Sequence, residues 1–551
     1  MEAIPVFPDY PPTLPNMMDS AVERFGDREF LVDGPTRLTY RQADAASAHL
    51  ARGLLALGVG KATRVAVVLP DCADWVLAWW AAARIGAFTI PLSTFFQAKE
   101  LGWALKEADI DTLIIVSNFL GRDYIERLER AVPGLAGQRG TRVAVPSHPY
   151  LRHVVVFGPC HDGDRPWAIQ GAGALRALAD ANPAIDAAFL SEVERQVYPA
   201  DLFIGICTSG STSQPKIVAH THGSVIRISH AFLDSFLGRM DPDDRNYSGM
   251  PLFWLGGLNS NLFPAIFKGA CMVFTPSPKP EDVLDTIVRE KVTRIMMWPV
   301  QYKPLTDLAA SRGIDLTPMM DHLHVQRPDG STIPPERRIA SLLGMTESFG
   351  PHGAGRWGEE LPEKNGASFG RRLRGVERKI VDPKTGKELP PRQDGELMIR
   401  GFSMMQGYYK RERADTFDAD GWFATGDTCA IDEDGHLYFR GRLGDMIKTT
   451  GANVSPLEVE AVMMTYPGVA EAVVVGLPDP ERGERVAAVV IAREGESVDP
   501  EDLRRRMLED MSSYKVPKDL FVMKYDEVPR TTTGKVHRIQ LKELLAKRMA
   551  A

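Results

Sequence analysis

The sequence predicts a mixed α/β protein with a large N-terminal domain, built from two βαβ-type sheets and a small β-barrel, and a small α+β C-terminal domain. Three observations favour this fold class: the length of the chain, an alternation of helical and strand-like runs in its first part, and two later changes of sequence pattern. Because 551 residues exceed what one ordinary hydrophobic core organises, at least two and as many as four packed units are expected.

The alternation is clearest in the first part of the chain. The expected helices and strands follow each other at 43–57, 64–69, 75–85, 87–91, 101–108 and 113–116. Strands that alternate with helices in this way indicate βαβ units and a parallel sheet. Residues 134–173 are richer in Gly, Pro and His, which favours surface excursions around one strand, His153–Phe157.

Two changes of pattern mark the later part of the chain. From 375 to 441, short strands alternate with Gly, Asp and Pro turns, which is typical of antiparallel β structure such as a small barrel. Later, Ser455 is a capping residue followed by Pro456 at the first helical position and Glu458 at the third, a strong helix start. We therefore divide the chain into an N-terminal domain, 1–443, and a C-terminal domain, 444–551.

Composition narrows the class of protein. Apolar residues make up 44% and charged residues 25%, the balance of a soluble globular protein. The net charge of −7 disfavours broad binding to nucleic acid, and the five scattered cysteines suit a reducing cytosol. No secretory signal is visible, and the apolar run 75–90 is interrupted by Arg84 and too short to span a bilayer. A cytoplasmic location is expected, whereas the sequence leaves a homodimer open.

The most informative run is the nine residues from Thr208 to Lys216, which follow a β-rich run at 202–207. Its hydroxyls, glycine and lysine can offer N–H and O–H donors and one cation to a polyphosphate. It is not a Walker A loop, which requires G-x-x-x-x-G-K-S/T. By itself, such a run is equally typical of a flexible surface loop.

Five further motifs, together with this loop, indicate a known family. The run resembles the T-S-G-S/T-S/T-G-x-P-K loop of the class I adenylate-forming superfamily, which includes acyl-CoA synthetases, adenylation domains and firefly luciferase. In the order of that family, the other matching segments are Gly344–Glu347, Gly395–Gly401, Gly421–Asp427, Gly441–Glu460 and Pro529–Lys535. The resemblance covers nearly the whole chain, and it is strongest to an acyl-CoA ligase.

The resemblance implies an enzyme that uses ATP to convert a carboxylic acid to an acyl-adenylate and then transfers the acyl group to coenzyme A, with release of AMP and pyrophosphate. The residues implied to bind the nucleotide are Thr208, Ser209, Gly210, Ser211, Thr212, Lys216, Leu343, Gly344, Asp427, Phe439 and Arg442. Thr346 is implied to contact the α-phosphate, and Glu347 with Thr208 to hold Mg²⁺. Lys535 is the implied catalytic cation between the carboxylate and the α-phosphate.

The resemblance also implies a mobile C-terminal domain that rotates between the two half-reactions. Gly444 is then the hinge, and Gly451 borders the channel for the coenzyme A thiol. Trp254, Gly256 and Gly257 fall in the segment that lines the acyl pocket. Because the neighbouring side chains are apolar, a fatty, cyclic or aryl acid is favoured over an amino acid.

Two departures concern the adenine pocket: Leu343 replaces the aromatic residue that usually precedes G-x-T-E, and the segment that begins at Pro328 looks shorter than in relatives. These departures leave open an inactive paralogue that binds without catalysis. A second alternative, which concerns the acceptor, is a stand-alone ligase that loads a carrier protein. The paired histidines at 220 and 222, and at 322 and 324, have no third metal ligand close in sequence, so packed or solvated side chains are favoured over zinc.

Overall fold

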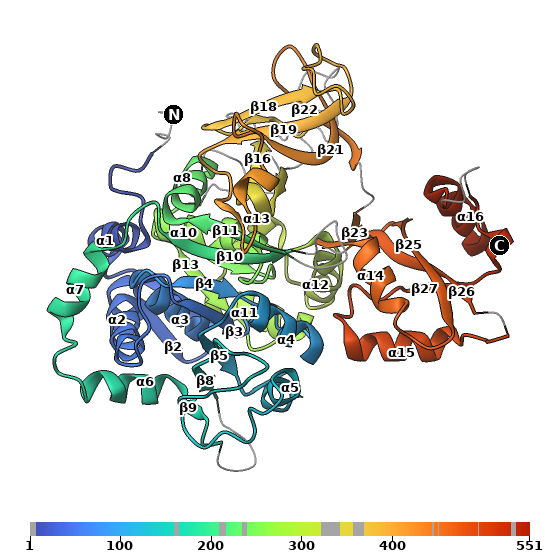
Figure 1. Cartoon of the computed structure of the whole chain (residues 1–551). Helices are drawn as coiled ribbons and strands as arrows, with labels where there is room; N and C mark the ends of the chain where they lie inside the picture. The colour runs from blue at the N-terminus through green and yellow to red at the C-terminus, as the bar shows by residue number, and fades with distance from the viewer. Residues whose placement is uncertain are drawn as a thin grey trace.

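The computed structural model shows a large body and a smaller one beside it (Figure 1). It describes residues 7–158, 165–208, 216–233, 240–320, 342–355, 368–442, 446–449, 451–493, 495–530 and 536–550. The smaller body consists of the last hundred or so residues, in orange and red. Along the described part of the chain, no helix is both long and apolar enough to cross a membrane.

The first sheet has eight strands in the order β20-β11-β10-β4-β3-β5-β8-β9. In chain order these are β3 Arg64–Val68, β4 Phe88–Pro91, β5 Thr112–Val116, β8 His153–Phe157, β9 Ala168–Gln170, β10 Leu202–Thr208, β11 Lys216–Thr221 and β20 Gly407–Tyr408. The run from β10 to β9 is parallel, which confirms the predicted βαβ units, and β11 pairs antiparallel to β10. A small hairpin, β6 Asn118–Phe119 with β7 Arg122–Asp123, follows β5.

Within the described residues, six helices lie between Tyr40 and the start of β10. They are α2 Tyr40–Ala56, α3 Ala73–Arg84, α4 Ala98–Glu107, α5 Tyr124–Ala131, α6 Gly171–Asp180 and α7 Ala187–Arg195. Thr39 and Gln42 form a reciprocal capping box that begins α2. Nearly every residue of α3 is buried, including Trp75, Trp79 and Trp80, as expected of a helix that is apolar all round.

The second sheet has five strands in the order β14-β12-β13-β1-β2. They are β1 Glu29–Asp33, β2 Thr36–Thr39, β12 Arg245–Ser248, β13 Cys271–Phe274 and β14 Arg294–Met296. The other described helices of the large body are α1 Leu14–Phe25, α8 His222–Phe232, α9 Leu255–Gly257, α10 Phe263–Lys268, α11 Pro280–Glu290, α12 Pro299–Ser311 and α13 Thr317–Met320, of which α8 contacts β10 and β11 of the first sheet. The sheet joins the N-terminal strand β1 to strands more than 200 residues away, so the start and the middle of the large body share one core.

Two further antiparallel sheets follow, and the second of them covers residues 375–441, where the sequence predicts a small barrel. The first contains β15 Leu343–Met345, β16 Gly350–Ala354 and β17 Arg371–Arg372, and the second contains β18 Val376–Val381, β19 Gly395–Gly401, β21 Phe423–Ile431 and β22 Leu437–Arg442. Backbone hydrogen bonds link Leu437 to Phe369 and Gly370, just before β17, so the two sheets are connected at this edge.

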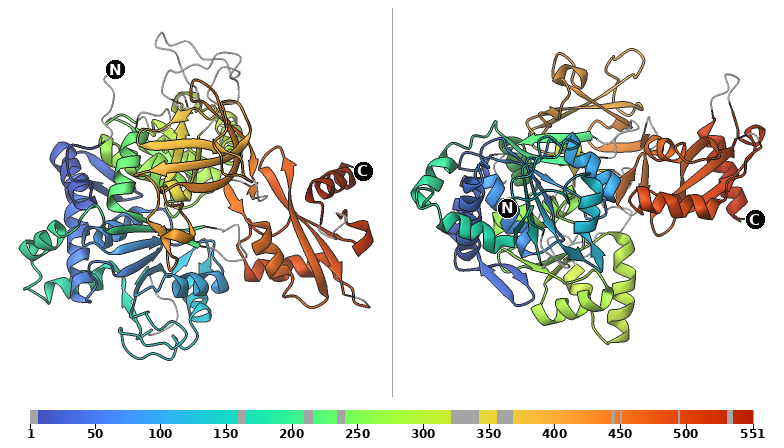
Figure 2. Two further views of the ribbon diagram at one scale, coloured as in Figure 1. Left: turned by 45° about the horizontal axis from the view of Figure 1, so that its top comes forward. Right: turned by 60° about the horizontal axis from the view of Figure 1, so that its bottom comes forward.

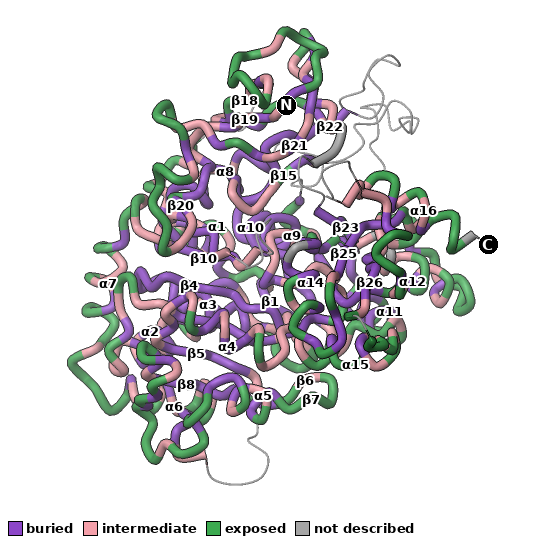
Figure 3. The backbone as a smooth tube through the Cα atoms, turned by 45° about the vertical axis from the view of Figure 1, so that its right-hand side comes forward, coloured by how far each residue is buried: buried purple, intermediate pink, exposed green. Residues whose placement is uncertain are grey.

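The C-terminal part has its own sheet and its own apolar clusters. Its elements are β23 Ile447–Thr449, β24 Ala452–Val454, α14 Pro456–Met463, β25 Val469–Asp479, β26 Gly483–Ala492, α15 Pro500–Asp510, β27 Asp519–Val522 and α16 Arg538–Ala550. The two clusters that cover this sheet contain only residues from Ile447 onwards. Figure 3 shows buried segments inside both bodies, and Figure 2 shows the small body at one end of the large one. The predicted boundary at 443/444 falls in part on residues that the structure does not describe.

Candidate active site

A β-hairpin positions the predicted phosphate loop. Thr208 ends β10, Lys216 begins β11, and the two residues are paired across the antiparallel ladder. The Thr208 hydroxyl donates to the Lys216 carbonyl oxygen at 3.4 Å, which closes the base of the loop. The predicted residues Ser209, Gly210, Ser211 and Thr212 lie outside the described residues. The structure therefore gives the two ends of the loop.

Thr346 and Glu347 lie in a short 3₁₀ turn, Thr346–Ser348, between β15 and β16. Two buried side chains contact the backbone of this turn. His220 Nε2 lies 2.7 Å from the Thr346 carbonyl oxygen, and Asn259 donates to the Phe349 carbonyl oxygen at 2.9 Å. Phe349 ends the turn with a left-handed backbone, φ +53°, which is uncommon for a side chain of this size. Buried polar contacts from two other segments thus fix the backbone of the predicted catalytic motif.

Tyr408 links Glu347 to Lys216, and each of the three comes from a different part of the chain. The Tyr408 hydroxyl donates to Glu347 Oε1 at 2.7 Å, and Lys216 Nζ lies 4.5 Å from the centre of the Tyr408 ring. The pairing of β20 with β11 brings Tyr408 to this position, beside the end of the phosphate loop. Burial and nearby Arg411 lower the pKa of Lys216, and the Glu347 carboxylate opposes them. One cation, one carboxylate and one phenol therefore converge here.

Sequence reasoning missed Tyr408 and His220. Tyr408 lies just after the Gly395–Gly401 motif, and nothing in its local pattern distinguishes it from a packed aromatic residue. From sequence, His220 is predicted to be a packed or solvated side chain rather than a zinc ligand, and its contact with Thr346 is not predicted. Its pairing across β10 and β11, four residues after Lys216, is the signal that places it beneath the site.

The predicted ribose residues lie on neighbouring strands. Asp427 on β21 is directly paired with Arg442 on β22, and the Asp427 side chain is buried. The side chain of Arg442 is not among those described. Phe439, also on β22, packs edge-on against Phe369, and Lys448 Nζ lies 4.5 Å above its ring. Phe439 is half-buried.

The two residues predicted beside adenine differ in their exposure. Leu343 is buried at 5% exposure in an apolar cluster with Val218 and Ile399, and its contact with a nucleotide stays a prediction. Gly344 is exposed, and a Cβ added there would lie 2.5 Å from the carbonyl group of Gly350. The close approach of β15 to β16 therefore requires glycine at this position.

The predicted acyl segment enters a short helix and then a π-helical turn, Leu258–Leu262. Such turns are frequent at functional sites. Trp254 precedes the helix and contacts the rings of Phe95 and Phe253. A Cβ on Gly257 would lie 2.4 Å from the Pro251 carbonyl oxygen, so the segment folds back tightly on itself.

Asp71 accepts a hydrogen bond from the start of this segment, a contact that the sequence does not predict. Its Oδ1 accepts the Leu252 N–H at 2.9 Å. Burial raises the pKa of Asp71 to about 7, and the Leu252 N–H opposes this rise. Asp71 follows β3 at the carboxyl end of the parallel sheet, where ligand sites of α/β proteins commonly lie.

Gly451 brings the C-terminal body to the acyl segment. It lies in the turn between β23 and β24 with φ +79°, and a Cβ added to it would lie 2.5 Å from ring atoms of Trp298. The same indole ring lies 3.4 Å from where a Cβ on Gly256 would be. Trp298 therefore separates the acyl segment from the C-terminal hairpin and touches both.

The remaining predicted residues, Gly444 and Lys535, lie outside the described residues. Two residues that flank Lys535 are described: Arg530 and Val536 form an isolated β-bridge, and Arg530 pairs with Glu471 on β25 at 2.7 Å. Helix α16, which begins at Arg538, lies on the side of the small body that faces away from the large one (Figures 1 and 2).

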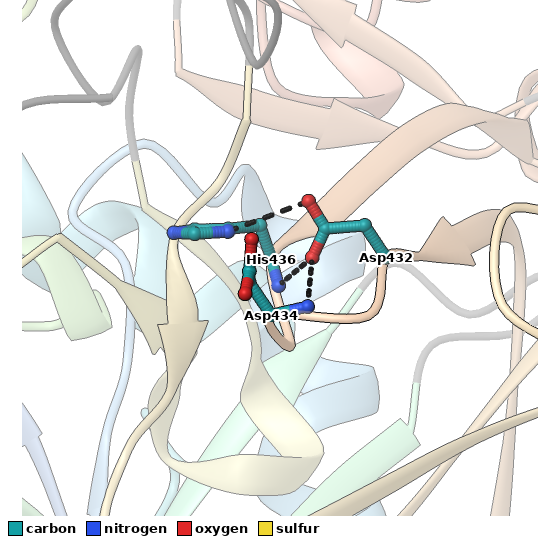
Figure 4. A group of neighbouring side chains, drawn as sticks. All are labelled: Asp432, Asp434 and His436. Carbon is teal, nitrogen blue, oxygen red and sulfur yellow. Dashed lines mark hydrogen bonds and ion pairs between the residues drawn. The ribbon is translucent and has the colours of Figure 1, made fainter. Parts of the chain in front are cut away.

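A group of Asp432, Asp434 and His436 lies in the turn between β21 and β22 (Figure 4). Asp432 Oδ1 accepts the backbone N–H groups of Asp434 and His436, and Oδ2 accepts the Tyr438 hydroxyl. Burial raises the pKa of Asp432, but these donors outweigh it and lower the pKa overall. Both oxygens of Asp432 thus serve to close the hairpin turn.

The described histidine pair is packed, as predicted. His222 Nδ1 accepts the Leu14 N–H at 3.2 Å, and its ring stacks on Phe203. Burial lowers the pKa of His220 to about 4 and that of His222 to about 3, so both are neutral at pH 7. His322 and His324 fall outside the described residues.

Comparison with known proteins defines the class. A family model described as AMP-binding enzyme matches residues 18–409, and one described as AMP-binding enzyme C-terminal domain matches residues 458–535. The chain belongs to the AMP-binding enzyme family. The family match and the curated relatives together confirm the predicted superfamily, the ATP-dependent acyl-CoA ligase chemistry and the enzyme class.

The chain is 31% identical to 3-[(3aS,4S,7aS)-7a-methyl-1,5-dioxo-octahydro-1H-inden-4-yl]propanoyl:CoA ligase of Mycobacterium tuberculosis, over 97% of this chain and 99% of that one. It is 29% identical to the acyl-CoA ligase SID4 of Ajellomyces capsulatus, over 97% and 91%. Among solved structures, it matches the amide bond synthetase McbA from Marinactinospora thermotolerans with a TM-score of 0.73 and 24% identity, over 97% and 99%. It matches o-succinylbenzoate CoA synthetase from Bacillus subtilis with a TM-score of 0.69 and 23% identity, over 96% and 98%. These two structures establish the fold alone.

Proposed function

We propose that this chain activates a largely apolar carboxylic acid as its acyl-adenylate and transfers the acyl group to coenzyme A. The observation that carries the proposal is the convergence of Lys216, Glu347 and Tyr408 at the base of the phosphate loop. Adenylation brings a carboxylate against a polyphosphate, so a fixed cation and positioned donors supply the main part of the catalysis.

In this proposal the loop 208–216 binds the β- and γ-phosphates, and Thr346 donates to the α-phosphate. Glu347 is the ligand for Mg²⁺, with Thr208 beside it, because Mg²⁺ prefers hard oxygen ligands. The half-buried Glu347 carboxylate fits this role, since Tyr408 orients one of its oxygens. Bound Mg²⁺ would neutralise charge on the phosphates. Asp427 and Arg442 bind the ribose, and Phe439 packs against the nucleotide.

Lys535 serves the first half-reaction in this proposal, and Gly451 the second. The Lys535 ammonium bridges the incoming carboxylate and the α-phosphate when the C-terminal domain, 444–551, turns about Gly444. The contact between Gly451 and Trp298 supports a thiol-transfer orientation for the arrangement described here. A glycine at 451 leaves room beside Trp298, which a larger residue would fill.

An apolar acid is favoured by the side chains around Trp254. Phe95 and Phe253 contact its ring, and Leu258, Leu262 and Phe263 are buried behind the same segment. The two curated relatives carry the names of an acyl-CoA ligase and of a ligase for a bicyclic propanoic acid, which supports a carboxylic acid with an apolar body. The scattered cysteines favour a reducing compartment such as the cytosol.

A panel of carboxylic acids with ATP and coenzyme A tests the proposal. The panel contains fatty, cyclic and aryl acids, with amino acids and dicarboxylic acids as polar comparisons. We expect AMP release that requires both an apolar acid and coenzyme A. If AMP release requires a carrier protein and not coenzyme A, the acyl acceptor is the carrier protein. If no acid is adenylated, the chain is a binding protein rather than a ligase.

A further inference from the structure

A buried lysine connects the two domains. Lys515, in the connection from α15 to β27, has only 4% of its side chain exposed. Its Nζ lies 3.0 Å from Glu100 Oε1 on α4 of the large body and 2.8 Å from Glu458 Oε1 on α14 of its own domain. The two carboxylates are 13% and 9% exposed. One ammonium group thus bridges the domains within a site that largely excludes water.

The Glu100 side chain is also held by its own helix in the large body. Its Oε2 accepts the backbone N–H of Gln97 at 3.0 Å and so caps the start of its own helix. The Ser512 hydroxyl then donates to the same carboxylate at 2.8 Å from the C-terminal side. A carboxylate that is already ordered loses little side-chain entropy on docking, which favours one geometry over neighbouring ones.

The bridge lies beside the other contacts of this interface. Tyr514, next to Lys515, packs edge-on against Phe95 and Trp254 of the acyl segment. Gly451 rests on Trp298 in the same interface. Buried ion pairs add little net stability, because desolvation offsets attraction, but they can specify one arrangement. The Glu100–Lys515 bridge is therefore suited to fixing the orientation of the domain.

We propose that Glu100 is a positioning residue for thiol transfer, which it serves by docking Lys515 so that the Gly451 hairpin lies against Trp298. This inference rests on the proposed function, because it assigns the docked orientation to the second half-reaction. Glu100 touches neither acid nor nucleotide in this account. Rotation of the domain for adenylation would separate Glu100 from Lys515, whereas the Lys515–Glu458 pair would travel with the domain intact.

Glu100→Gln is the sharpest test. Glutamine keeps an oxygen that accepts the Gln97 N–H, so the start of α4 is preserved while the charge is lost. In the full-length protein, enzyme-bound acyl-adenylate is first formed from ATP and the best acid of the panel, and coenzyme A is then added. We expect single-turnover thioester formation to fall at least tenfold, while ATP–pyrophosphate exchange without coenzyme A stays within twofold of the wild type or rises.

The matched control is Lys99→Gln. Lys99 is the neighbouring residue on α4 and also reaches the C-terminal domain, at 3.7 Å from Asp510, but its side chain is 60% exposed. Exposed pairs contribute little, so both half-reactions should stay unchanged. Ser512→Ala, which removes the second donor and leaves the ion pair, should slow thioester formation by less than Glu100→Gln does.

The two half-reactions separate the possible failures. An unchanged rate of thioester formation in Glu100→Gln would overturn the inference, and so would equal slowing of both half-reactions, which indicates general damage. Absence of acid-dependent exchange in the wild type would instead contradict the proposed function.

Discussion

At the scale of single residues, the site depends on side chains that fix the positions of other groups. Glu347 accepts the Tyr408 hydroxyl, and the neighbouring Thr346 carbonyl is held by His220. Each contact joins segments that are far apart in the sequence. A preorganised carboxylate does not need to reorient as charge develops, which is the main advantage of such a site over water.

Tyr408→Phe tests this preorganisation. Removing the hydroxyl frees Glu347 to rotate, so adenylation should slow by about tenfold, a loss on the order of 1.4 kcal/mol. ATP–pyrophosphate exchange at varied Mg²⁺ concentration measures the effect. Tyr409→Phe is the matched control, because its hydroxyl donates to Asp109 instead and its loss should leave exchange unchanged. Equal exchange rates in both variants and the wild type would show that Glu347 needs no such support.

His222 predicts how stability depends on pH. Burial lowers its pKa to about 3 from 6.5, so below pH 6.5 the unfolded chain takes up a proton that the folded chain does not. The stability contributed by neutral His222 is present above pH 6.5 and is lost as pH falls toward 3. The expected slope is at most about 1.4 kcal/mol per pH unit.

His222→Asn is the corresponding variant, because the amide oxygen can replace Nδ1 as acceptor of the Leu14 N–H. Thermal melts between pH 6.5 and 5 should show a shallower decline than in the wild type. The surface variant His49→Asn, which alters an exposed pair with Asp180, serves as the control. A decline as steep in His222→Asn as in the wild type would refute the role of burial.

At the scale of elements, the β23–β24 hairpin makes one of the contacts between the domains. Its turn is possible because Gly451 combines a left-handed backbone, φ +79°, with the absence of a side chain beside Trp298. Both requirements act at one position, so a substitution there affects the docking of the domain as well as the local turn.

Gly451→Val should therefore block thioester formation and spare adenylation. Its Cβ would overlap the Trp298 ring in the docked orientation, whereas the other orientation does not require that contact. We expect a loss of at least tenfold in thioester formation from preformed acyl-adenylate. Gly435→Val is a control for backbone strain alone, since Gly435 has φ +82° but open space around it. Similar losses in both variants would assign the effect to strain.

The elements themselves could largely be predicted from sequence, because their signals are local. The alternating runs became β3, α3, β4, α4 and β5 with small shifts at the ends, and the cap at Ser455 begins α14 as predicted. Contacts between segments could not be predicted in this way. Tyr408, Asp71 and Trp298 meet the site through strand order and domain packing, which no local pattern encodes.

The same contrast between local signals and contacts across segments applies to the predicted site residues. Motif residues such as Thr208, Lys216, Glu347 and Asp427 follow from the resemblance, and the structure brings the first three to one region. Their roles stay predictions. The identity of the acid is harder still to predict from sequence, because side chains far apart in the chain, such as Phe95, Phe253 and Trp254, come together around the acyl segment.

At the scale of the whole molecule, a small domain with its own core stands beside a large one. An ion-pair bridge, an aromatic contact and a glycine on an indole ring make up much of the described interface. Interfaces of this kind permit rotation between orientations. The proposed reaction therefore requires two orientations of the small domain, with Lys535 at the reacting groups in one of them.

The most direct test of the central claim is acid-dependent ATP–pyrophosphate exchange, measured without coenzyme A in the wild type and in Lys535→Ala. Exchange detects the acyl-adenylate step alone, so it does not depend on the thiol. We predict exchange with at least one apolar acid, and a loss of at least a hundredfold in Lys535→Ala with ATP binding retained. No exchange with any acid of the panel, or full exchange in Lys535→Ala, would contradict the account.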